Sequence, residues 1–364
     1  MKSSGNIDWY IALVVTGLML FSITFVYSAS ATFADVKFGS SEQLFYQHLI
    51  RVIIALVIMI VMSRIDYHHL REFTRPLMVV SLLLLLYVKF GGVAAKGATR
   101  WVNFGFISFQ PSELAKFALL IHVSRLLADK KEKIVNFKEG ILPPLIWICI
   151  VCGLIALQPN FSTSFVVFLL SLTLIILAGA QKKHLLALGA TGVIAGGIFA
   201  IGAEYRMKRL LAYFGSEQTA NSPVVYQLQQ ALLAFGNGGF LGVGPGQSRQ
   251  RDWFLPEPYG DFIFSIVGEE YGYLGVILIL MGFGIVLWRG VVAARFAPDT
   301  FGFLLASGIT LTLCFYAFIN AGVNCGLLPT TGLPMPFVSY GGTSILFSAA
   351  AVGILLNISG QRKM

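Results

Sequence analysis

Charged residues are scarce in this sequence. Asp, Glu, Lys and Arg make up only 12% of its 364 residues, while hydrophobic residues make up 56%. An average soluble domain carries roughly 25% charged residues, so the composition excludes a soluble globular fold. Apolar runs of the roughly 17–25 residues that cross a bilayer as a helix recur along the whole length. The composition therefore predicts one integral membrane domain over residues 1–364.

Cysteine and histidine are also rare, with four and five residues respectively. The histidines show no spacing typical of a metal site. Cys149 and Cys152 have the Cys-x-x-Cys spacing of redox and metal motifs, but they lie in an apolar segment, where two small hydrophobic residues are the commoner occurrence. The cysteines are therefore predicted to carry no function.

Ten apolar segments are predicted to form helices, which gives an all-α, polytopic membrane protein. The first segment could instead be a cleaved signal sequence, but it is long for one and many apolar segments follow it. The fifth and sixth segments are divided at Gln158-Pro159-Asn160 because the combined run is too long for one span. The ten segments are 9–29, 44–63, 77–95, 112–128, 141–158, 160–178, 184–202, 261–288, 301–325 and 340–358.

The net charge of +9 would suit a nucleic-acid partner, but the distribution of basic residues explains it better. With the N-terminus in the cytoplasm, the inside segments carry 14 Lys and Arg residues and the short outside loops carry three. By the positive-inside rule, this bias predicts both termini in the cytoplasm and no nucleic-acid partner. The inside residues are Lys2, Arg64, Arg71, Arg75, Lys130, Lys131, Lys133, Lys138, Lys182, Lys183, Arg289, Arg295, Arg362 and Lys363, and the outside residues are Lys37, Lys96 and Arg100.

Three segments on the predicted outer side are expected to be irregular. Residues 91–112 contain glycines and polar groups that break a helix. Residues 203–260 form a long loop, which in a compact membrane protein is usually functional. Within this loop, an amphipathic helix over 223–235 is expected to begin at Ser222-Pro223 and to lie on the outer leaflet. Residues 326–342 contain three prolines and four glycines and are expected to line an outward-facing cavity.

Charge collects in residues 249–272, at the outer edge of the eighth predicted helix. Charge at a membrane boundary is costly, so its concentration there indicates a functional site. Asp261 either caps that helix or acts in catalysis, and the pattern leaves both open. Glu269 and Glu270 lie about 12–13 Å deeper along a helix, too far for a carboxylate pair with Asp261, and are expected to pair with a buried cation. Arg51, in the second predicted helix, requires an acid or a carbonyl partner.

Glu113 and Lys116 share one face of the fourth predicted helix at i, i+3. Inside a membrane, the two side chains either neutralise each other or bind other groups. In the second interpretation, Lys116 joins Arg100, Arg249 and Arg251 in a cationic pocket for an anionic headgroup such as a pyrophosphate. The sequence leaves a structural ion pair and a binding pocket as equal alternatives.

Five motifs follow one another along the chain. They are Lys96-Gly97-Ala98-x-Arg100-Trp101, Gln110-Pro111-Ser112-Glu113-Leu114-Ala115-Lys116, Leu255-Pro256-Glu257-x-x-x-Asp261-Phe262-Ile263-Phe264, Gly268-Glu269-Glu270 and Pro336-x-x-Ser339-Tyr340-Gly341-Gly342. Together they resemble the SEDS family of bacterial cell-wall polymerases (shape, elongation, division and sporulation), over nearly the whole chain. Tyr27-Ser28-Ala29-Ser30, Gly246-Gln247-Ser248-Arg249-Gln250 and Leu255-Pro256-Glu257-Pro258 resemble the division members more than the elongation members.

The resemblance implies a peptidoglycan glycosyltransferase that polymerises the lipid-linked disaccharide lipid II at the outer face of the cytoplasmic membrane, at the division septum. It makes Asp261 the base that deprotonates the acceptor hydroxyl. Implied partners are lipid II, the nascent lipid-linked glycan, a class B penicillin-binding protein that cross-links the strands, and other division proteins. A divalent cation, Mg²⁺ or Mn²⁺, is also implied, with unknown ligands. The candidate headgroup-binding residues are Arg100, Trp101, Glu113, Lys116, Arg249 and Arg251, and the expected supporting residues are Arg51, Glu269, Glu270 and Ser339.

The sequence departs from the family pattern at two places. Asn160 stands where the family often has an aspartate, and Tyr259-Gly260 replaces a His-Thr or His-Asn pair before Asp261, so a histidine partner for Asp261 is not expected. Membrane-embedded charges would equally suit a lipid II flippase or transporter, and a division scaffold and an elongation-type polymerase are further alternatives. The enzyme is favoured because the polar motif residues gather at the outer ends of the apolar segments, whereas a flippase needs polar lining in both halves.

Overall fold

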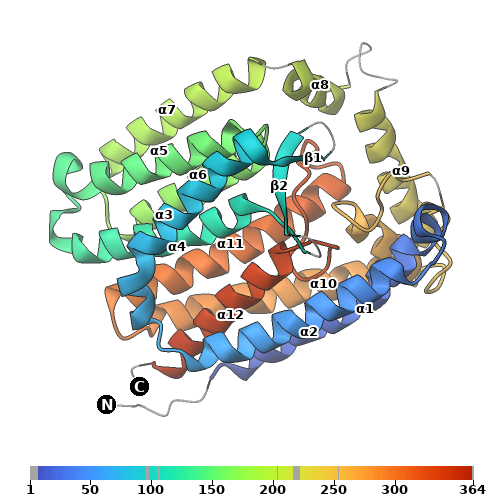
Figure 1. The fold of residues 1–364 in the computed structure, drawn as a ribbon, viewed down its shortest axis with the longest axis horizontal. Coiled ribbons are helices and arrows are strands. Elements are labelled where there is room, and N and C mark those ends of the chain that lie inside the picture. The colour runs from blue at the N-terminus through green and yellow to red at the C-terminus, as the bar shows by residue number, and fades with distance from the viewer. Residues whose placement is uncertain are drawn as a thin grey trace.

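Helices make up most of the chain in the computed structural model, which describes residues 7–95, 98–104, 107–202, 204–215, 222–252 and 254–362 (Figure 1). The helices are α1 Trp9–Phe38, α2 Gln43–Arg64, α3 His68–Gly91, α4 Pro111–Asp129, α5 Leu142–Ala156, α6 Phe161–Leu177, α7 Lys182–Ile201, α8 Glu204–Tyr213, α9 Pro223–Gly238, α10 Ile263–Arg295, α11 Thr300–Asn324 and α12 Ser344–Gly360. A short 3-10 helix, Lys131–Lys133, and a π-helical turn, Phe137–Ile141, precede α5.

The ten predicted apolar helices correspond to α1–α7 and α10–α12, which confirms the all-α class. Among the described residues, six helical segments are long and apolar enough to cross a membrane, and α6 and α12 are shorter apolar helices. The predicted ends are less accurate. Helix α1 continues to Phe38, and α3 begins at His68 and passes through Pro76. The additional turns at the ends of these helices are polar, so a prediction based on hydropathy alone does not include them.

The segment between α3 and α4 contains a small antiparallel sheet that the sequence did not predict. Its strands are β1 Val93–Ala95, β2 Ala98–Phe104 and β3 Ile107–Phe109, in the order β1-β2-β3. Trp101 pairs with Val93 across β1 and β2. A methyl group added at Gly342 would lie 3.1 Å from the Trp101 ring, so the sheet lies directly against the connection between α11 and α12. The prediction of a break in helical structure in this segment is confirmed.

The predicted long loop, 203–260, contains two helices rather than one. Helix α8 was not predicted. Helix α9 begins where the sequence indicates, because Ser222 accepts a hydrogen bond from Val225 N (3.4 Å) and Pro223 occupies the first turn. It ends at Gly238, slightly later than expected, and packs against α10, where the Phe235 ring lies 5.9 Å from the Phe264 ring.

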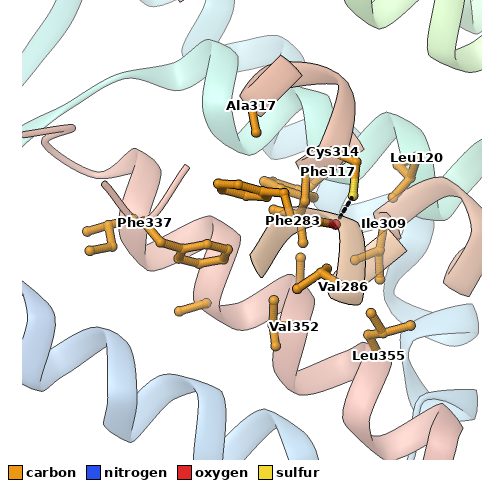
Figure 2. Packing of buried hydrophobic residues seen from close by; sticks show 14 of the residues in the cluster. Phe117, Leu120, Phe283, Val286, Ile309, Cys314, Ala317, Phe337, Val352 and Leu355 are labelled. Atoms are coloured by element: carbon orange, nitrogen blue, oxygen red, sulfur yellow. Dashed lines mark hydrogen bonds between the residues drawn. The ribbon is translucent and has the colours of Figure 1, made fainter. Parts of the chain in front are cut away.

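The core lies where α4, α10, α11 and α12 meet (Figure 2). Phe283 of α10 and Leu355 of α12 are fully buried there, and Cys314 Sγ donates a hydrogen bond to Phe283 O (3.6 Å). Small residues allow close helix approach: a methyl group added at Gly290 of α10 would clash with Thr310 of α11. The four cysteines are free.

Both ends of the described chain are joined by ion pairs. Asp8, just before α1, accepts from Arg289 Nε (2.9 Å) and from Arg362 Nη2 (2.6 Å), and Asp8 N donates to Ser359 Oγ (3.0 Å). The two termini therefore lie at the same end of the bundle, and α9 lies at the opposite end (Figure 1). This arrangement agrees with an even number of membrane spans.

Candidate functional site

Asp261 lies in the turn before α10, and α11 fixes its backbone. Its carbonyl oxygen accepts hydrogen bonds from Asn320 Nδ2 (2.7 Å) and from Asn324 Nδ2 (2.9 Å). Asn320 also donates to Leu333 O (2.8 Å), which ties the connection between α11 and α12 to the same point. The N-cap position of α10 is Phe262, so Asp261 is not the helix cap that one interpretation of the sequence required.

A cavity of about 400 Å³ lies close to Asp261, although Asp261 is not among its lining residues. A methyl group added at Gly332, which lines this cavity, would lie 3.6 Å from Asp261 Oδ2. The walls come from the turn before α6 and its first half, from Ile319 of α11 and from Leu328–Gly332. Arg100 of β2 and Arg209 of α8 complete the lining. The glycine- and proline-rich segment 326–342 therefore contributes to a cavity, as predicted.

Two arginines reach this cavity and donate to backbone carbonyls. Arg100 donates from Nε to Gln158 O (3.1 Å) and from Nη2 to Pro159 O. Arg209 donates from Nη1 to Thr330 O (3.3 Å). These contacts orient both guanidinium groups at the cavity, and guanidinium groups bind anions through charge-assisted hydrogen bonds.

The cavity also contains polar side chains that carry no charge. Thr330 Oγ1 and Thr331 Oγ1 are buried and have no hydrogen-bond partner among the described residues. Asn160, which stands where the family often has an aspartate, is buried in the wall. The lining therefore combines two cations with neutral hydrogen-bonding groups.

Lys116 does not line the cavity. Its Nζ donates to Glu113 Oε2 (2.8 Å), and each side chain is only 5% exposed. The same ammonium group lies 4.2 Å from the centre of the Tyr316 ring. Tyr316 packs in turn against Val166, a residue of the cavity wall. The ion pair is thus buried beneath the cavity and is neutralised within α4.

Arg249 and Arg251 are also absent from the cavity lining. Arg249 is exposed. Arg251 Nη1 donates to Ser28 Oγ (2.9 Å) and Ser28 O (3.1 Å) on α1, and lies 3.9 Å from Glu270 Oε1. The structure does not bring the four candidate cations together in one pocket: Lys116 and Arg251 each lie beside a carboxylate, and Arg249 is outside the cavity lining. Only Arg100 of the four lines the cavity.

The two glutamates of α10 fasten the preceding segment to the bundle. Glu269 accepts from Asn237 Nδ2 (3.1 Å), Gln250 N (3.2 Å) and Ser248 Oγ. Glu270 accepts from Ser28 Oγ (2.5 Å). The expected cation is present for Glu270, at 3.9 Å from Arg251, but Glu269 is satisfied by neutral donors instead. Both are fully buried, which is consistent with support rather than substrate contact.

A break in α10 at Gly272 allows backbone hydrogen bonds between α10 and the segment after α9. Gly272 has φ 63° and ψ −161°, a conformation restricted to glycine, and interrupts the helical hydrogen bonds. The carbonyls of Glu269 and Glu270 accept from Val243 N (2.9 Å) and Gly244 N (3.0 Å). The segment after α9 thus pairs with α10 through backbone groups in the manner of a strand.

A second polar cluster lies around Tyr340. The Arg51 guanidinium carbon lies 4.7 Å from the centre of the Tyr340 ring, and Arg51 Nη1 is buried without a hydrogen-bond partner. The predicted acid or carbonyl partner of Arg51 is therefore wrong within the part of the chain that the structure describes, where an aromatic face takes its place. Ser339 Oγ accepts from Met335 N (2.9 Å) and closes the adjacent turn.

Tyr259 connects this cluster to Asp261, two residues away. Tyr340 N donates to Tyr259 O (2.9 Å), and the two rings meet edge to face at 5.6 Å. Burial raises the pKa of the Tyr259 hydroxyl well above its ordinary value, so this side chain stays protonated at neutral pH. Trp101 packs over Gly342 in the connection before α12 and does not line the cavity.

Among the described residues, His, Cys, Asp and Glu form no group of three or more that would hold a metal ion. The residues around the cavity therefore do not fit a metal centre built by the protein alone. The groups that the described lining and its rim supply are one carboxylate, two guanidinium groups and neutral hydrogen-bonding side chains.

Sequence reasoning missed Arg209, Asn320 and Asn324. The two asparagines had a detectable signal, because amides one turn apart in an apolar helix need partners. Arg209 belongs to a short polar segment in the long outer connection, and its sequence shows no apolar run.

The chain matches the cell cycle protein family FtsW/RodA/SpoVE over residues 8–364. The probable peptidoglycan glycosyltransferase FtsW of Geobacter metallireducens is 39% identical over 100% of this chain and 97% of the relative. The stage V sporulation protein E of Bacillus subtilis is 37% identical over 97% of this chain and 96% of the relative. Several other FtsW proteins are 33–37% identical over nearly the full length, which confirms the resemblance to division members.

Solved structures give the same result. A chain from a peptidoglycan synthase complex that coordinates polymerization and crosslinking superposes with a TM-score of 0.81 at 27% identity, over 98% of both chains. The rod-shape-determining protein RodA of Thermus thermophilus superposes with a TM-score of 0.73 at 26% identity, again over 98% of both chains. The chain therefore belongs to the FtsW/RodA/SpoVE family of cell cycle proteins, the SEDS family that its motifs resemble.

Proposed function

We propose that this protein is a peptidoglycan glycosyltransferase that polymerises lipid II into glycan strands during cell division. The relatives named as peptidoglycan glycosyltransferases support the reaction class. The observation that carries the proposal is the position of the Asp261 carboxylate at the edge of a cavity lined by two arginines and an apolar wall. Such a cavity suits a substrate with a sugar, a pyrophosphate and a lipid chain.

In the proposed reaction, Asp261 acts as a general base. It removes the proton from the acceptor sugar hydroxyl while that oxygen forms a bond to the anomeric carbon of the donor. The bond between this carbon and the pyrophosphate oxygen breaks, and the pyrophosphate leaves with the bonding electrons. The products are a glycan longer by one unit, a lipid pyrophosphate and protonated Asp261, which returns its proton to water.

The cations act on the leaving group. Negative charge grows on the pyrophosphate as the bond to the sugar breaks, and a fixed guanidinium lowers the energy of that charge in the transition state. Arg100 is the cavity arginine carried by a family motif. Its two carbonyl contacts hold the side chain in place before substrate binds.

The proposal places the active site at the outer face of the cytoplasmic membrane, with both termini in the cytoplasm and the protein at the septum. The solved synthase complex that coordinates polymerization and crosslinking supports a cross-linking partner, here proposed to be a class B penicillin-binding protein. Other division proteins are proposed as further partners. A divalent cation, Mg²⁺ or Mn²⁺, would reach this site with the substrate pyrophosphate, since such ions bind phosphates through few protein ligands.

The test is polymerisation of fluorescent lipid II by the purified protein together with its penicillin-binding partner. We expect Asp261→Asn to lower the rate about 10²–10⁴-fold, the usual contribution of a general base, with unchanged thermal unfolding. Asp252→Asn is the matched control, because that carboxylate accepts from Thr32 Oγ1 (2.6 Å) outside the cavity. Polymer formed by Asp261→Asn at the wild-type rate excludes Asp261 as the base. Headgroup flipping in vesicles without polymer would support the transporter instead.

A further inference from the structure

Helix α10 begins without a side-chain cap of its own. Its N-cap residue is Phe262, which has no side-chain oxygen, and no side-chain cap hydrogen bond forms there. The backbone N–H of Ser265, the third residue of the helix, donates instead to Asn324 Oδ1 of α11 (3.2 Å). In an ordinary helix, the side chain of the N-cap residue accepts from an N–H at this position. Asn324 therefore caps α10 from the neighbouring helix.

The other end of the Asn324 amide holds the residue that precedes this cap. Asn324 Nδ2 donates to Asp261 O (2.9 Å), so one amide group joins the Asp261 turn to the first turn of α10. A carbonyl only accepts and a backbone N–H only donates, so the two contacts fix the orientation of the amide. Asn324 is fully buried, and bulk water does not compete for either contact.

Asn320, one turn earlier on α11, connects Asp261 to the cavity wall. Its Nδ2 donates to Asp261 O (2.7 Å) and to Leu333 O (2.8 Å). An amide has two N–H groups, and Asn320 uses one for each carbonyl. Leu333 directly follows Gly332, which lines the cavity and lies close to Asp261 Oδ2. A single side chain therefore sets the distance between Asp261 and this part of the wall.

We propose that Asn320 and Asn324 are positioning residues of the polymerase reaction, and that Asn320 holds Asp261 at its working distance from the cavity wall. The inference rests on the proposed role of Asp261 as the base. A base must lie within hydrogen-bond distance of the hydroxyl that it deprotonates, and a displacement of about 1 Å can lower a rate about a hundredfold. Neither asparagine lines the cavity, so both act through the backbone of Asp261 rather than on the substrate.

Asn357 of α12 offers a matched control for a purely structural role. Its Oδ1 accepts from Tyr67 N (3.0 Å) and its Nδ2 donates to Ser63 O (3.0 Å), so it also joins a helix to a neighbouring turn through backbone groups. It lies near the C-terminal end of the chain, at the end of the bundle where the two termini meet (Figure 1). Replacing Asn357 removes comparable hydrogen bonds without changing the Asp261 turn.

The experiment measures kcat and KM for polymerisation of fluorescent lipid II by the purified full-length protein with its penicillin-binding partner. Tm and backbone hydrogen exchange in residues 261–266 are measured on the same variants. Asn320→Ala is expected to lower kcat about ten- to hundredfold and to change KM much less, because the cavity side chains remain. Asn324→Ala should lower kcat less, since Asp261 O keeps its bond from Asn320, and should speed exchange in 261–266. Asn357→Ala should lower Tm and leave kcat unchanged.

A wild-type kcat for Asn320→Ala would overturn the inference. So would a loss of kcat in Asn357→Ala as large as that in Asn320→Ala, because destabilisation alone would then explain both. If Asn320→Ala does not fold, Asn324→Ala provides the test, and faster exchange in 261–266 at the wild-type kcat would overturn the positioning role.

Asp261→Asn, measured in the same assay, separates this inference from the proposed function. If Asp261→Asn makes no polymer and Asn320→Ala polymerises normally, only the positioning role fails. If Asp261→Asn polymerises at the wild-type rate, the proposed function fails, and the positioning role fails with it. Loss of polymer in Asp261→Asn together with the reduced kcat of Asn320→Ala supports both.

Discussion

Replacing Lys116 by methionine tests whether the buried pair in α4 is structural. Lys116 Nζ and Glu113 Oε2 are 2.8 Å apart, and each side chain is 5% exposed. Lys116→Met would leave the Glu113 carboxylate buried without its counter-charge. Removing one partner of a buried ion pair costs about 3–5 kcal/mol, and the contact of the ammonium with the Tyr316 ring (4.2 Å) is lost as well.

The same physics makes an opposite prediction for the double variant. Replacing both partners by apolar residues of similar volume removes the desolvation cost together with the attraction, and is often neutral or stabilising. We therefore expect Glu113→Leu combined with Lys116→Met to recover most of the stability that Lys116→Met loses. The two single losses should exceed the double loss by several kcal/mol, as expected for residues in contact.

Thermal unfolding in detergent measures this cycle. For a chain of 364 residues, a loss of about 3–5 kcal/mol corresponds to a fall in Tm of about 4–6 °C when the entropy of unfolding is scaled with chain length. A Tm of Lys116→Met equal to that of the wild type would refute the reasoning. So would a double variant no more stable than the single one, because the pair would then not account for the loss.

Two further predictions concern the break in α10 and the chain termini. Gly272→Ala is expected to destabilise the protein by at least about 2–3 kcal/mol, because its conformation is restricted to glycine and the added methyl would clash with the backbone of Gly242. Gly284→Ala on the same helix has open space around the added methyl and should be neutral. Equal Tm values for Gly272→Ala and Gly284→Ala would contradict this prediction. Burial raises the pKa of the Asp8 carboxyl, but hydrogen bonds from two arginines outweigh it and lower the pKa. Asp8→Asn should therefore lower stability by about 2–3 kcal/mol at neutral pH. The difference in stability between Asp8→Asn and the wild type should shrink as pH falls below about 4 and vanish below the lowered pKa of folded Asp8, because the carboxylate is then protonated. A stability difference that persists at lower pH would contradict the ion-pair role of Asp8.

Hydropathy predicted the ten long helices because each must place a full apolar run in the membrane. It failed for α8 and for the three strands, whose short segments carry no such run. The start of α9 was predicted correctly because capping is local: Ser222 and the Val225 N–H that it binds are three residues apart. Features that depend on residues close in sequence could therefore be predicted from the sequence, and features that depend on tertiary packing could not.

The same distinction between local and remote contacts explains which parts of the candidate site were predicted. Asp261 was identified from charge at a membrane boundary and from the motifs around it. The structure does not bring the four predicted cations together, and two of them bind groups remote in sequence: Arg251 binds Ser28, 223 residues away, and Arg100 binds Gln158 O, 58 residues away. Spacing along one helix does predict the Glu113–Lys116 pair. It contains no information on which remote side chains a loop brings to a cavity.

The charged stretch 249–272 contains carboxylates with two different tasks, and their surroundings separate them. Glu269 and Glu270 are fully buried and accept from hydroxyl, amide and backbone donors, so they hold the segment after α9 against α10. Asp261 is only half-buried, and the two asparagines of α11 anchor its backbone carbonyl. Because the hydrogen bonds are made to the backbone carbonyl, they hold Asp261 in place independently of the contacts of its carboxylate. One carboxylate oxygen lies close to Gly332, which lines the cavity, and this position suits the general base that we propose.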